Sequence, residues 1–325
     1  MASVVLQSGA SMSNDINLAM DDNVKKTILE KSASQLSVSM ANGYSAVITG
    51  SGMTYDSKSE WIGGTGTGVT VSKNGQLLLT FSNLSVPASD NSYDTGYGGQ
   101  AAGPQGELAY WLRDNDTVTG AGGNETLLGY GGNDTLTGAA GNDLIDGGSG
   151  ADTAVYSGNS SLYTIQKNGS AWNVTSAAEG IDNLTNVERI KFADKTLAMD
   201  SDGNAGQAYR LYQAAFNRTP DKSGLKYWIT TIDNGASLKA AASAFTESQE
   251  FAALYGGNNP SADTLITKLY SNVLHRSPDQ GGYDYWKGQL ASGSVDKTGL
   301  LVNFSESAEN KAALIGVIQN GIDIT

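Results

Sequence analysis

A repeat of nine residues between positions 116 and 155 constrains the fold of this chain more than any other feature. Each repeat carries one acidic residue, an apolar residue two positions later, and glycines at matching positions. The acidic positions are Asp116, Glu125, Asp134, Asp143 and Asp152, and the apolar positions are Val118, Leu127, Leu136, Ile145 and Ala154. Because glycine tolerates backbone conformations closed to other residues, each repeat predicts a tight turn followed by a short strand with one inward side chain.

The side chains of this repeat offer oxygen ligands. The 325-residue chain has no cysteine and one histidine, His275, which excludes thiolate metal sites and zinc sites with two histidines. Ca²⁺ takes six to eight oxygen ligands, which carboxylates and carbonyls of stacked turns supply. With 33 acidic and 20 basic residues the formal net charge is -13, which disfavours nucleic acid and anionic membranes as partners. No apolar run is long enough to predict a membrane span.

Four repeats from Gly120 to Val155 resemble the RTX family of calcium-binding proteins, whose pattern is GGxGxDxUx. In that family two repeats form one turn of a parallel β-roll, so carboxylates that face one ion are 18 residues apart. The resemblance implies about three bound Ca²⁺ ions. The implied carboxylate pairs are Asp116 with Asp134, Glu125 with Asp143, and Asp134 with Asp152. The implied backbone ligands come from Gly129, Tyr130, Gly131, Gly132, Gly138, Ala140, Gly147 and Ser149.

The array departs from the family pattern at four positions. Glu125 replaces aspartate, and its longer side chain is expected to weaken its site. Ala121, Tyr130 and Ala139 stand where the pattern has its second glycine. The alternative to a metal-binding roll is a glycine-rich surface loop that matches the pattern by chance.

Other segments resemble elements that accompany RTX arrays. Residues 182–194, DNLTNVERIKFAD, are similar to the segment that often follows such arrays. Proteins of this family leave Gram-negative bacteria by type I secretion with an uncleaved C-terminal signal, and residues 316–325, GVIQNGIDIT, resemble such signals. The N-terminal sequence lacks the pattern of a secretory signal peptide. The resemblance therefore implies the type I secretion machinery as a partner and an extracellular or cell-surface location.

A second repeat, with a period of 58 residues, predicts an all-helical domain over residues 204–325. Residues 210–228 reappear as residues 268–286, and both copies have apolar residues at the spacing of an amphipathic helix. Thr219 and Ser277 are expected to be N-caps, each followed by a proline at the first helical position. Gly235 and Gly293 are placed to end the helices that follow.

The helical repeat resembles an uncharacterised domain family that often accompanies RTX arrays, and the resemblance implies no activity. It covers nearly all of residues 204–316. Arg218 and Arg276 are interpreted as helix caps or partners of nearby acids rather than anion ligands. Six aromatic residues are expected in the core, with a ligand-stacking surface as the alternative. They are Tyr212, Tyr227, Trp228, Tyr270, Tyr285 and Trp286.

The remaining sequence predicts β-structure on both sides of the array. Residues 1–110 form a β-rich domain, residues 111–158 the roll, and residues 159–203 a flank with a hairpin at the Asn168–Gly169 turn. Residues 63–71, GGTGTGVTV, repeat the glycine spacing of the array with Gly68 in place of the carboxylate, so they could form a similar turn but could not bind metal in the same way.

These observations predict a multidomain chain, β plus all-α, with a calcium-bound parallel β-roll. We expect a secreted, non-enzymatic structural protein, such as a surface-layer, filament or adhesin-like component, that folds and assembles on binding Ca²⁺ outside the cell. Its expected partners are a second copy of itself or a cell-surface polysaccharide or protein. One alternative is an enzyme or toxin whose catalytic part lies in residues 1–110, where no catalytic motif occurs. Another is an extracellular carbohydrate- or partner-binding module that uses exposed aromatic residues.

Overall fold

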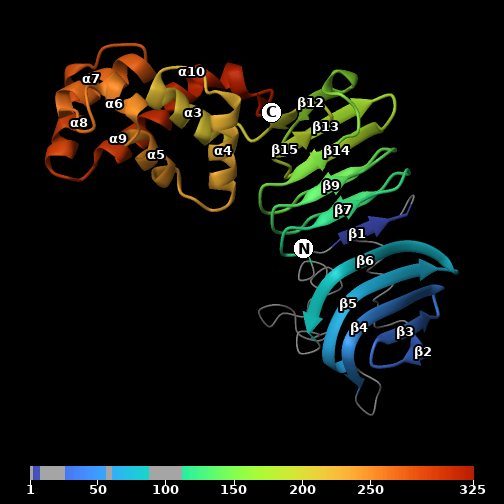
Figure 1. Ribbon diagram of the computed structural model, residues 1–325. Coiled ribbons are helices and arrows are strands. Elements are labelled where there is room, and N and C mark those ends of the chain that lie inside the picture. The colour runs from blue at the N-terminus through green and yellow to red at the C-terminus, as the bar shows by residue number, and fades with distance from the viewer. Residues whose placement is uncertain (1–2, 8–25, 56–60, 88–111) are drawn as a thin grey trace. The chain divides into compact units, whose positions relative to one another are not determined.

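The computed structural model describes residues 3–7, 26–55, 61–87 and 112–325. They form two compact units, one ending at Asp194 and the other beginning at Lys195. The first unit is made mainly of strands and the second mainly of helices, which confirms the predicted combination of β and all-α parts (Figure 1). Within the predicted β-rich region, residues 1–2, 8–25, 56–60 and 88–110 lie outside the described residues.

An antiparallel sheet makes up the N-terminal part of the first unit. Its strands follow the chain order β2 to β6, and β1 lies beside β6. Along β4 the buried residues Tyr44, Ala46 and Ile48 alternate with more exposed ones, as expected for a sheet with one covered face. The strands are β1 (Ser3–Leu6), β2 (Lys26–Lys31), β3 (Gln35–Met40), β4 (Tyr44–Tyr55), β5 (Trp61–Lys73) and β6 (Gln76–Pro87).

The turn expected at residues 63–71 is wrong. This segment lies inside β5, where Gly68 pairs with Thr49 on one side and Ser82 on the other. Val69 and Val71 are buried at alternate positions, and this apolar alternation favours a strand over a turn.

The nine-residue repeats form a parallel β-roll, as predicted. Each repeat contributes one strand of three residues, and successive strands alternate between two sheets, so two repeats make one coil. Leu136 lies between Val118 and Ala154 in one stack, and Ile145 lies beside Leu127 in the other. All five side chains are buried. The strands are β7 (Thr117–Thr119), β8 (Thr126–Leu128), β9 (Thr135–Thr137), β10 (Leu144–Asp146) and β11 (Thr153–Val155).

The first coil is paired with β1. Val4 is paired with Val118 of β7 in parallel and with Phe81 of β6 antiparallel. Val4 and Leu6 are fully buried. This strand therefore joins the antiparallel sheet to the roll.

Residues after the repeats add one more coil. β12 and β13 form the antiparallel hairpin around Asn168 and Gly169. β14 then pairs in parallel with β10, and β15 pairs in parallel with β11, so Leu184 and Ile190 extend the two buried stacks. The elements are a short 3-10 helix (Ser160–Leu162), β12 (Thr164–Asn168), β13 (Ala171–Ser176), β14 (Gly180–Thr185) and β15 (Arg189–Lys191).

The second unit contains two copies of a four-helix arrangement. The first copy comprises α3 (Asn204–Phe216), α4 (Lys222–Asp233), α5 (Leu238–Thr246) and α6 (Gln249–Tyr255). The second comprises α7 (Ala262–Val273), α8 (Gln280–Ala291), α9 (Lys297–Ser305) and α10 (Ala308–Ile318). The predicted all-helical region also contains β17 (Ile322–Asp323), which pairs antiparallel with β16 (Thr196–Ala198).

The helix starts differ from the sequence prediction. Asp221, rather than Thr219, is the N-cap of α4 and accepts a 2.7 Å hydrogen bond from the Gly224 N–H. Asp279, rather than Ser277, caps α8 in the same way. Aspartate is as good an N-cap as threonine or serine, and here the proline lies just before the cap instead of just after it. Each helix ends before a glycine with positive φ, as predicted at positions 235 and 293.

Paired arginines and aromatic residues occupy equivalent places in the two copies. Arg218 binds Glu250 and Arg276 binds Glu309, with Nε to Oε1 distances of 2.7 and 2.8 Å, which confirms their interpretation as partners of acids. Tyr212 and Tyr270 are buried. Trp228 and Trp286 are partly buried against the core, but Tyr227 and Tyr285 are 62% and 57% exposed, so the prediction of core packing is wrong for these two.

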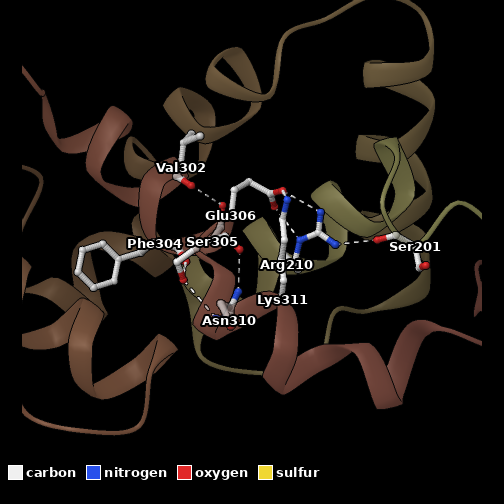
Figure 2. Close-up of polar contacts among 9 residues, drawn as sticks. Ser201, Arg210, Val302, Phe304, Ser305, Glu306, Asn310 and Lys311 are labelled. Carbon is white, nitrogen blue, oxygen red and sulfur yellow. Dashed lines mark hydrogen bonds and ion pairs between the residues drawn. The ribbon is translucent and has the colours of Figure 1, made fainter.

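One buried ion pair has no counterpart in the other copy. Arg210, which is 1% exposed, donates to Glu306 through Nε and Nη2 at 2.7 and 2.8 Å and to the Ser201 carbonyl at 2.7 Å (Figure 2). Lys311 lies 3.1 Å from the same glutamate. Position 268, the equivalent of 210, is a lysine. The pair joins α3 to the residue that follows α9.

Candidate metal centre

The acidic residues of the roll form two ladders along its axis. In the first ladder, the N–H of Asp116 donates to Asp134 Oδ1 at 2.7 Å, and the N–H of Asp134 donates to Asp152 Oδ1 at 2.8 Å. In the second ladder, the N–H of Glu125 donates to Asp143 Oδ1 at 2.7 Å. These are the three pairs that the resemblance implied, each 18 residues apart on successive coils.

An asparagine ladder runs beside each acid ladder in the opposite direction. The N–H of Asn133 donates to Asn115 Oδ1 at 2.7 Å, and the N–H of Asn142 donates to Asn124 Oδ1 at 2.8 Å. The acid of a later coil therefore holds the earlier coil, while the asparagine of the earlier coil holds the later one. This reciprocal bonding fixes the stacking of the turns.

Three aspartates each keep one buried oxygen without a hydrogen-bond partner. These atoms are Oδ2 of Asp134, Asp143 and Asp152. The three residues are at most 2% exposed. A buried carboxylate oxygen without a donor costs about 1–3 kcal/mol or more. In a fold otherwise so regularly bonded, this pattern indicates that a cation belongs beside these atoms.

Glycines create the space next to these oxygens. A Cβ atom at Gly129 would collide with both Asp134 Oδ2 and the Gly147 carbonyl oxygen. A Cβ at Gly120 would lie 3.0 Å from Glu125 Oε2 and 2.5 Å from the Gly138 carbonyl oxygen. Carboxylate and carbonyl oxygens therefore converge from two coils on the place that a Cβ atom would fill. These oxygens are the kind of donor that suits Ca²⁺.

The other backbone ligands implied by the resemblance are placed differently. The carbonyls of Tyr130 and Ser149 accept hydrogen bonds from the N–H groups of Ser149 and Gly132, at 2.9 and 3.0 Å. The Gly129 carbonyl accepts from Gly131 at 3.0 Å, and the Gly132 carbonyl faces Gly150. Ala140 is exposed. Among the implied carbonyls, those of Gly138 and Gly147 lie beside carboxylate oxygens.

Glu125 behaves differently from the aspartates. Its Oε1 accepts from the Gly123 N–H at 3.0 Å and its Oε2 from the Ala121 N–H at 3.4 Å, so the longer side chain folds back onto its own turn. Tyr130 and Ala139, which replace glycine, adopt φ values of 66° and 71°. This conformation is unfavourable for residues with a Cβ, so the roll keeps its turn geometry at an energetic cost.

The buried aspartates are hard to ionise in the absence of a cation. Burial raises the pKa of Asp134 from 3.8 to about 8, and the neighbouring Asp152 and Asp116 add to the effect. Burial likewise raises the pKa of Asp143 to about 7 and that of Asp152 to about 6, although backbone N–H groups oppose the shift in each case. A bound cation would reverse this penalty.

Sequence reasoning missed two acids that continue the ladders. Asp182 Oδ1 accepts from the Asp143 N–H at 2.9 Å, and Glu188 Oε2 accepts from the Asp152 N–H at 2.8 Å. Asp182 is 1% exposed, and burial raises its pKa to about 6. The sequence signal was the flank DNLTNVER itself, which carries both acids but at spacings of 39 and 36 instead of 18.

No group of three or more acidic, histidine or cysteine side chains that could hold a metal occurs within the described part of the chain. A site here therefore depends on backbone carbonyls as much as on carboxylates. The sole histidine, His275, is exposed and follows α7 with a φ of 53°. Its counterpart Asn217 follows α3 with a φ of 49°, so both residues serve to end a helix.

Comparison with known families identifies the two repeats. Residues 119–154 match the RTX calcium-binding nonapeptide repeat in four copies. Residues 203–255 and 242–314 match a domain of unknown function, DUF4214. The chain thus contains RTX repeats and a DUF4214 region, as the sequence resemblances indicated. RTX repeats indicate a secreted calcium-binding protein and typically mark export by type I secretion.

Solved structures and curated proteins add little. The extracellular lipase LipA from Serratia marcescens is similar at 25% identity over 24% of this chain, with a TM-score of 0.24. The chain spans 13% of the lipase's length, and so small a likeness has no bearing on activity. No curated protein matches the chain. Among the described residues, no helix has the length and apolar character to cross a membrane.

Proposed function

We propose that this chain is a non-enzymatic extracellular structural protein, a surface-layer, filament or adhesin-like component, whose roll becomes rigid on binding Ca²⁺ after export. The observation that carries the proposal is the set of buried Oδ2 atoms of Asp134, Asp143 and Asp152, which have no hydrogen-bond partner. A bound Ca²⁺ ion would be the positively charged partner of these oxygens. Where Ca²⁺ is scarce, the close carboxylates repel each other and oppose coil stacking.

The energetic effect of the cation is large enough to switch the fold of the roll. Each site that binds only the folded state stabilises it by about 2.7 kcal/mol when Ca²⁺ is at a hundredfold excess over Kd. Three such sites would contribute about 8 kcal/mol, which is comparable to the whole stability of a typical domain. A chain that unfolds in the cytosol and folds outside is consistent with export by type I secretion.

The test is a calcium titration of the purified chain. We expect far-ultraviolet circular dichroism to gain β signal with Ca²⁺ and equilibrium dialysis to show bound ions. A β signal and a melting temperature that are the same in chelator and in Ca²⁺, or no bound Ca²⁺, would sink the proposal. Negative-stain microscopy with and without Ca²⁺ tests the structural role, because a surface-layer or filament component forms ordered assemblies while an enzyme does not require them.

A second candidate is a carbohydrate- or partner-binding module, and exposed tyrosines favour it. Tyr227 and Tyr285 are exposed at equivalent places of the two helical copies, each in edge contact with a tryptophan. Exposed aromatic rings of this kind suit stacking on a sugar. A glycan array probed with the full chain and with a Tyr227→Ala, Tyr285→Ala double variant distinguishes the two candidates, because binding lost in the variant supports the module.

A further inference from the structure

The last turn of the first ladder is built from sequence outside the repeats. A Cβ atom at Gly147 would collide with the Asn186 carbonyl oxygen and lie 2.5 Å from Asp152 Oδ2. At Gly129, one coil earlier, the corresponding atoms are the Gly147 carbonyl oxygen and Asp134 Oδ2. The carbonyl of Asn186 therefore stands where the repeats place a glycine carbonyl.

We propose that residues 186–188 complete an additional Ca²⁺ site at the end of the array, with Asp152 Oδ2 and the Asn186 carbonyl oxygen as ligands. Glu188 is its positioning residue. The inference rests on the proposed binding of Ca²⁺ by the repeats. It adds a site that neither the repeat pattern nor its 18-residue pairing contains.

The two carboxylate oxygens of Asp152 have different surroundings, and these suit a metal ligand. It is 0% exposed, and its Oδ1 is already engaged by the Asp134 N–H at 2.8 Å. Its Oδ2 has no hydrogen-bond partner and lies 2.5 Å from the place that a Cβ atom at Gly147 would fill. A carboxylate and a carbonyl oxygen at one buried position form a hard, oxygen-only donor set, which selects Ca²⁺ over softer metals.

The flank also fixes the backbone of Asp152. Glu188 Oε2 accepts from the Asp152 N–H at 2.8 Å. In return, the N–H groups of Glu188 and Arg189 donate to the Asp152 carbonyl at 3.2 and 2.8 Å. Asn186 adopts a φ of 49°, and its side chain donates to Asp146 Oδ1 at 2.8 Å, which holds the turn that presents its carbonyl.

The second ladder ends differently. The three atoms nearest to a Cβ at Gly138 all belong to Asp143, whereas the nearest atom at Gly129 and at Gly147 is a carbonyl oxygen of the next coil. Burial raises the pKa of Asp182, and the Tyr156 side chain opposes part of that rise. The rings of Tyr156 and Phe192 stack with centroids 5.7 Å apart. The inference is therefore confined to the first ladder.

Counting ions in variants of the full chain tests the proposal. Asp134→Asn and Asp152→Asn each keep an oxygen that accepts the backbone bond but remove the ligand charge. Native mass spectrometry in Ca²⁺ should show fewer bound ions in each single variant than in wild type, and fewer in the double variant than in Asp134→Asn alone. If the double variant loses no more ions than Asp134→Asn alone, the two aspartates share one site and the proposal is overturned. A wild-type chain that binds no Ca²⁺ contradicts the proposed function itself.

Two further measurements remain informative if a variant fails to fold. Glu188→Ala should lower the affinity for one Ca²⁺ ion by about tenfold. Glu188→Gln, which keeps an acceptor for the Asp152 N–H, should restore this affinity. Equal affinities in wild type and Glu188→Ala would refute the positioning role. In the wild-type chain, hydrogen exchange at residues 186–191 should slow on adding Ca²⁺ at the concentration that protects the repeats. Unchanged exchange there, with protected repeats, would rule out the terminal site.

Discussion

Replacing Asp134 by asparagine should change the stability of the roll in opposite directions with and without Ca²⁺. In the chelated protein at about pH 9, Asp134 is ionised because its pKa is about 8, and its Oδ2 is buried without a partner. Asparagine keeps Oδ1 as the acceptor of the Asp116 N–H, and its amide N–H₂ group can donate to the Gly147 carbonyl. Removing an unsatisfied buried acceptor should stabilise the calcium-free roll by about 1–3 kcal/mol.

With Ca²⁺ the sign reverses. The variant loses the charge that holds one ion, and with it about 2.7 kcal/mol at a hundredfold excess of Ca²⁺ over Kd. A difference of 1 kcal/mol shifts the melting temperature of a unit of this size by about 2–4 °C. Thermal unfolding followed by circular dichroism, in chelator and in Ca²⁺, should therefore show two shifts of several degrees with opposite signs.

Asp114→Asn is the matched control for this experiment. Asp114 is exposed and precedes the same ladder, so the substitution removes one negative charge without touching a buried oxygen. It should shift neither melting temperature by more than about 1 °C. If Asp134→Asn moves both temperatures in the same direction, or if Asp114→Asn produces the same reversal, the buried oxygen is not the cause.

Three further predictions follow from other contacts. The pKa of Asp134 is about 8 in the folded roll and 3.8 ordinarily, so between these two pH values the folded roll binds more protons than the unfolded chain. Thermal melts in chelator should therefore show stability that is greatest below about pH 4 and is lost as the pH rises to about 8. Equilibrium dialysis should show Ca²⁺ affinity that rises with pH. Leu136→Ala removes a fully buried side chain from the stack, and urea unfolding in Ca²⁺ should show a loss of about 2–5 kcal/mol. Arg210→Ala leaves Glu306 with Lys311 as its ion-pair partner and should lower the stability of the helical unit by about 3 kcal/mol. Arg218→Ala breaks an exposed pair and should lower it by under about 1 kcal/mol. Thermal melts that follow the helical signal measure both effects.

The regular parts of the fold were predictable because the spacing of apolar residues in the sequence matches the spacing of buried positions in the structure. Val118, Leu127 and Leu136 recur every nine residues, since each repeat must place one side chain inside the roll. The helical copies were predictable for the same reason, from the amphipathic spacing before each proline. The carboxylate pairs followed from the resemblance to RTX repeats, which implies that two repeats make one coil.

The remaining features escaped prediction because they depend on contacts between segments of irregular spacing. A hairpin of β12 and β13 separates Asp143 from Asp182, so the sequence distance no longer reveals that they are neighbours. The N-caps were misplaced because Thr219 and Asp221 are both good caps, and only the backbone geometry separates them. The exposure of Tyr227 depends on how neighbouring helices pack, which the pattern of one helix does not contain.

The alternation of the repeats between two sheets limits how such an array can change in length. Inserting or deleting one repeat would transfer every later acid to the opposite sheet, so that Asp182 and Glu188 would meet the wrong partners at the final coil. Inserting two repeats would preserve every hydrogen bond between the acids of successive coils, because the bonded acids are 18 residues apart. Gene duplication or recombination is therefore expected to lengthen the roll by whole coils, without changing the segments that precede and follow the repeats.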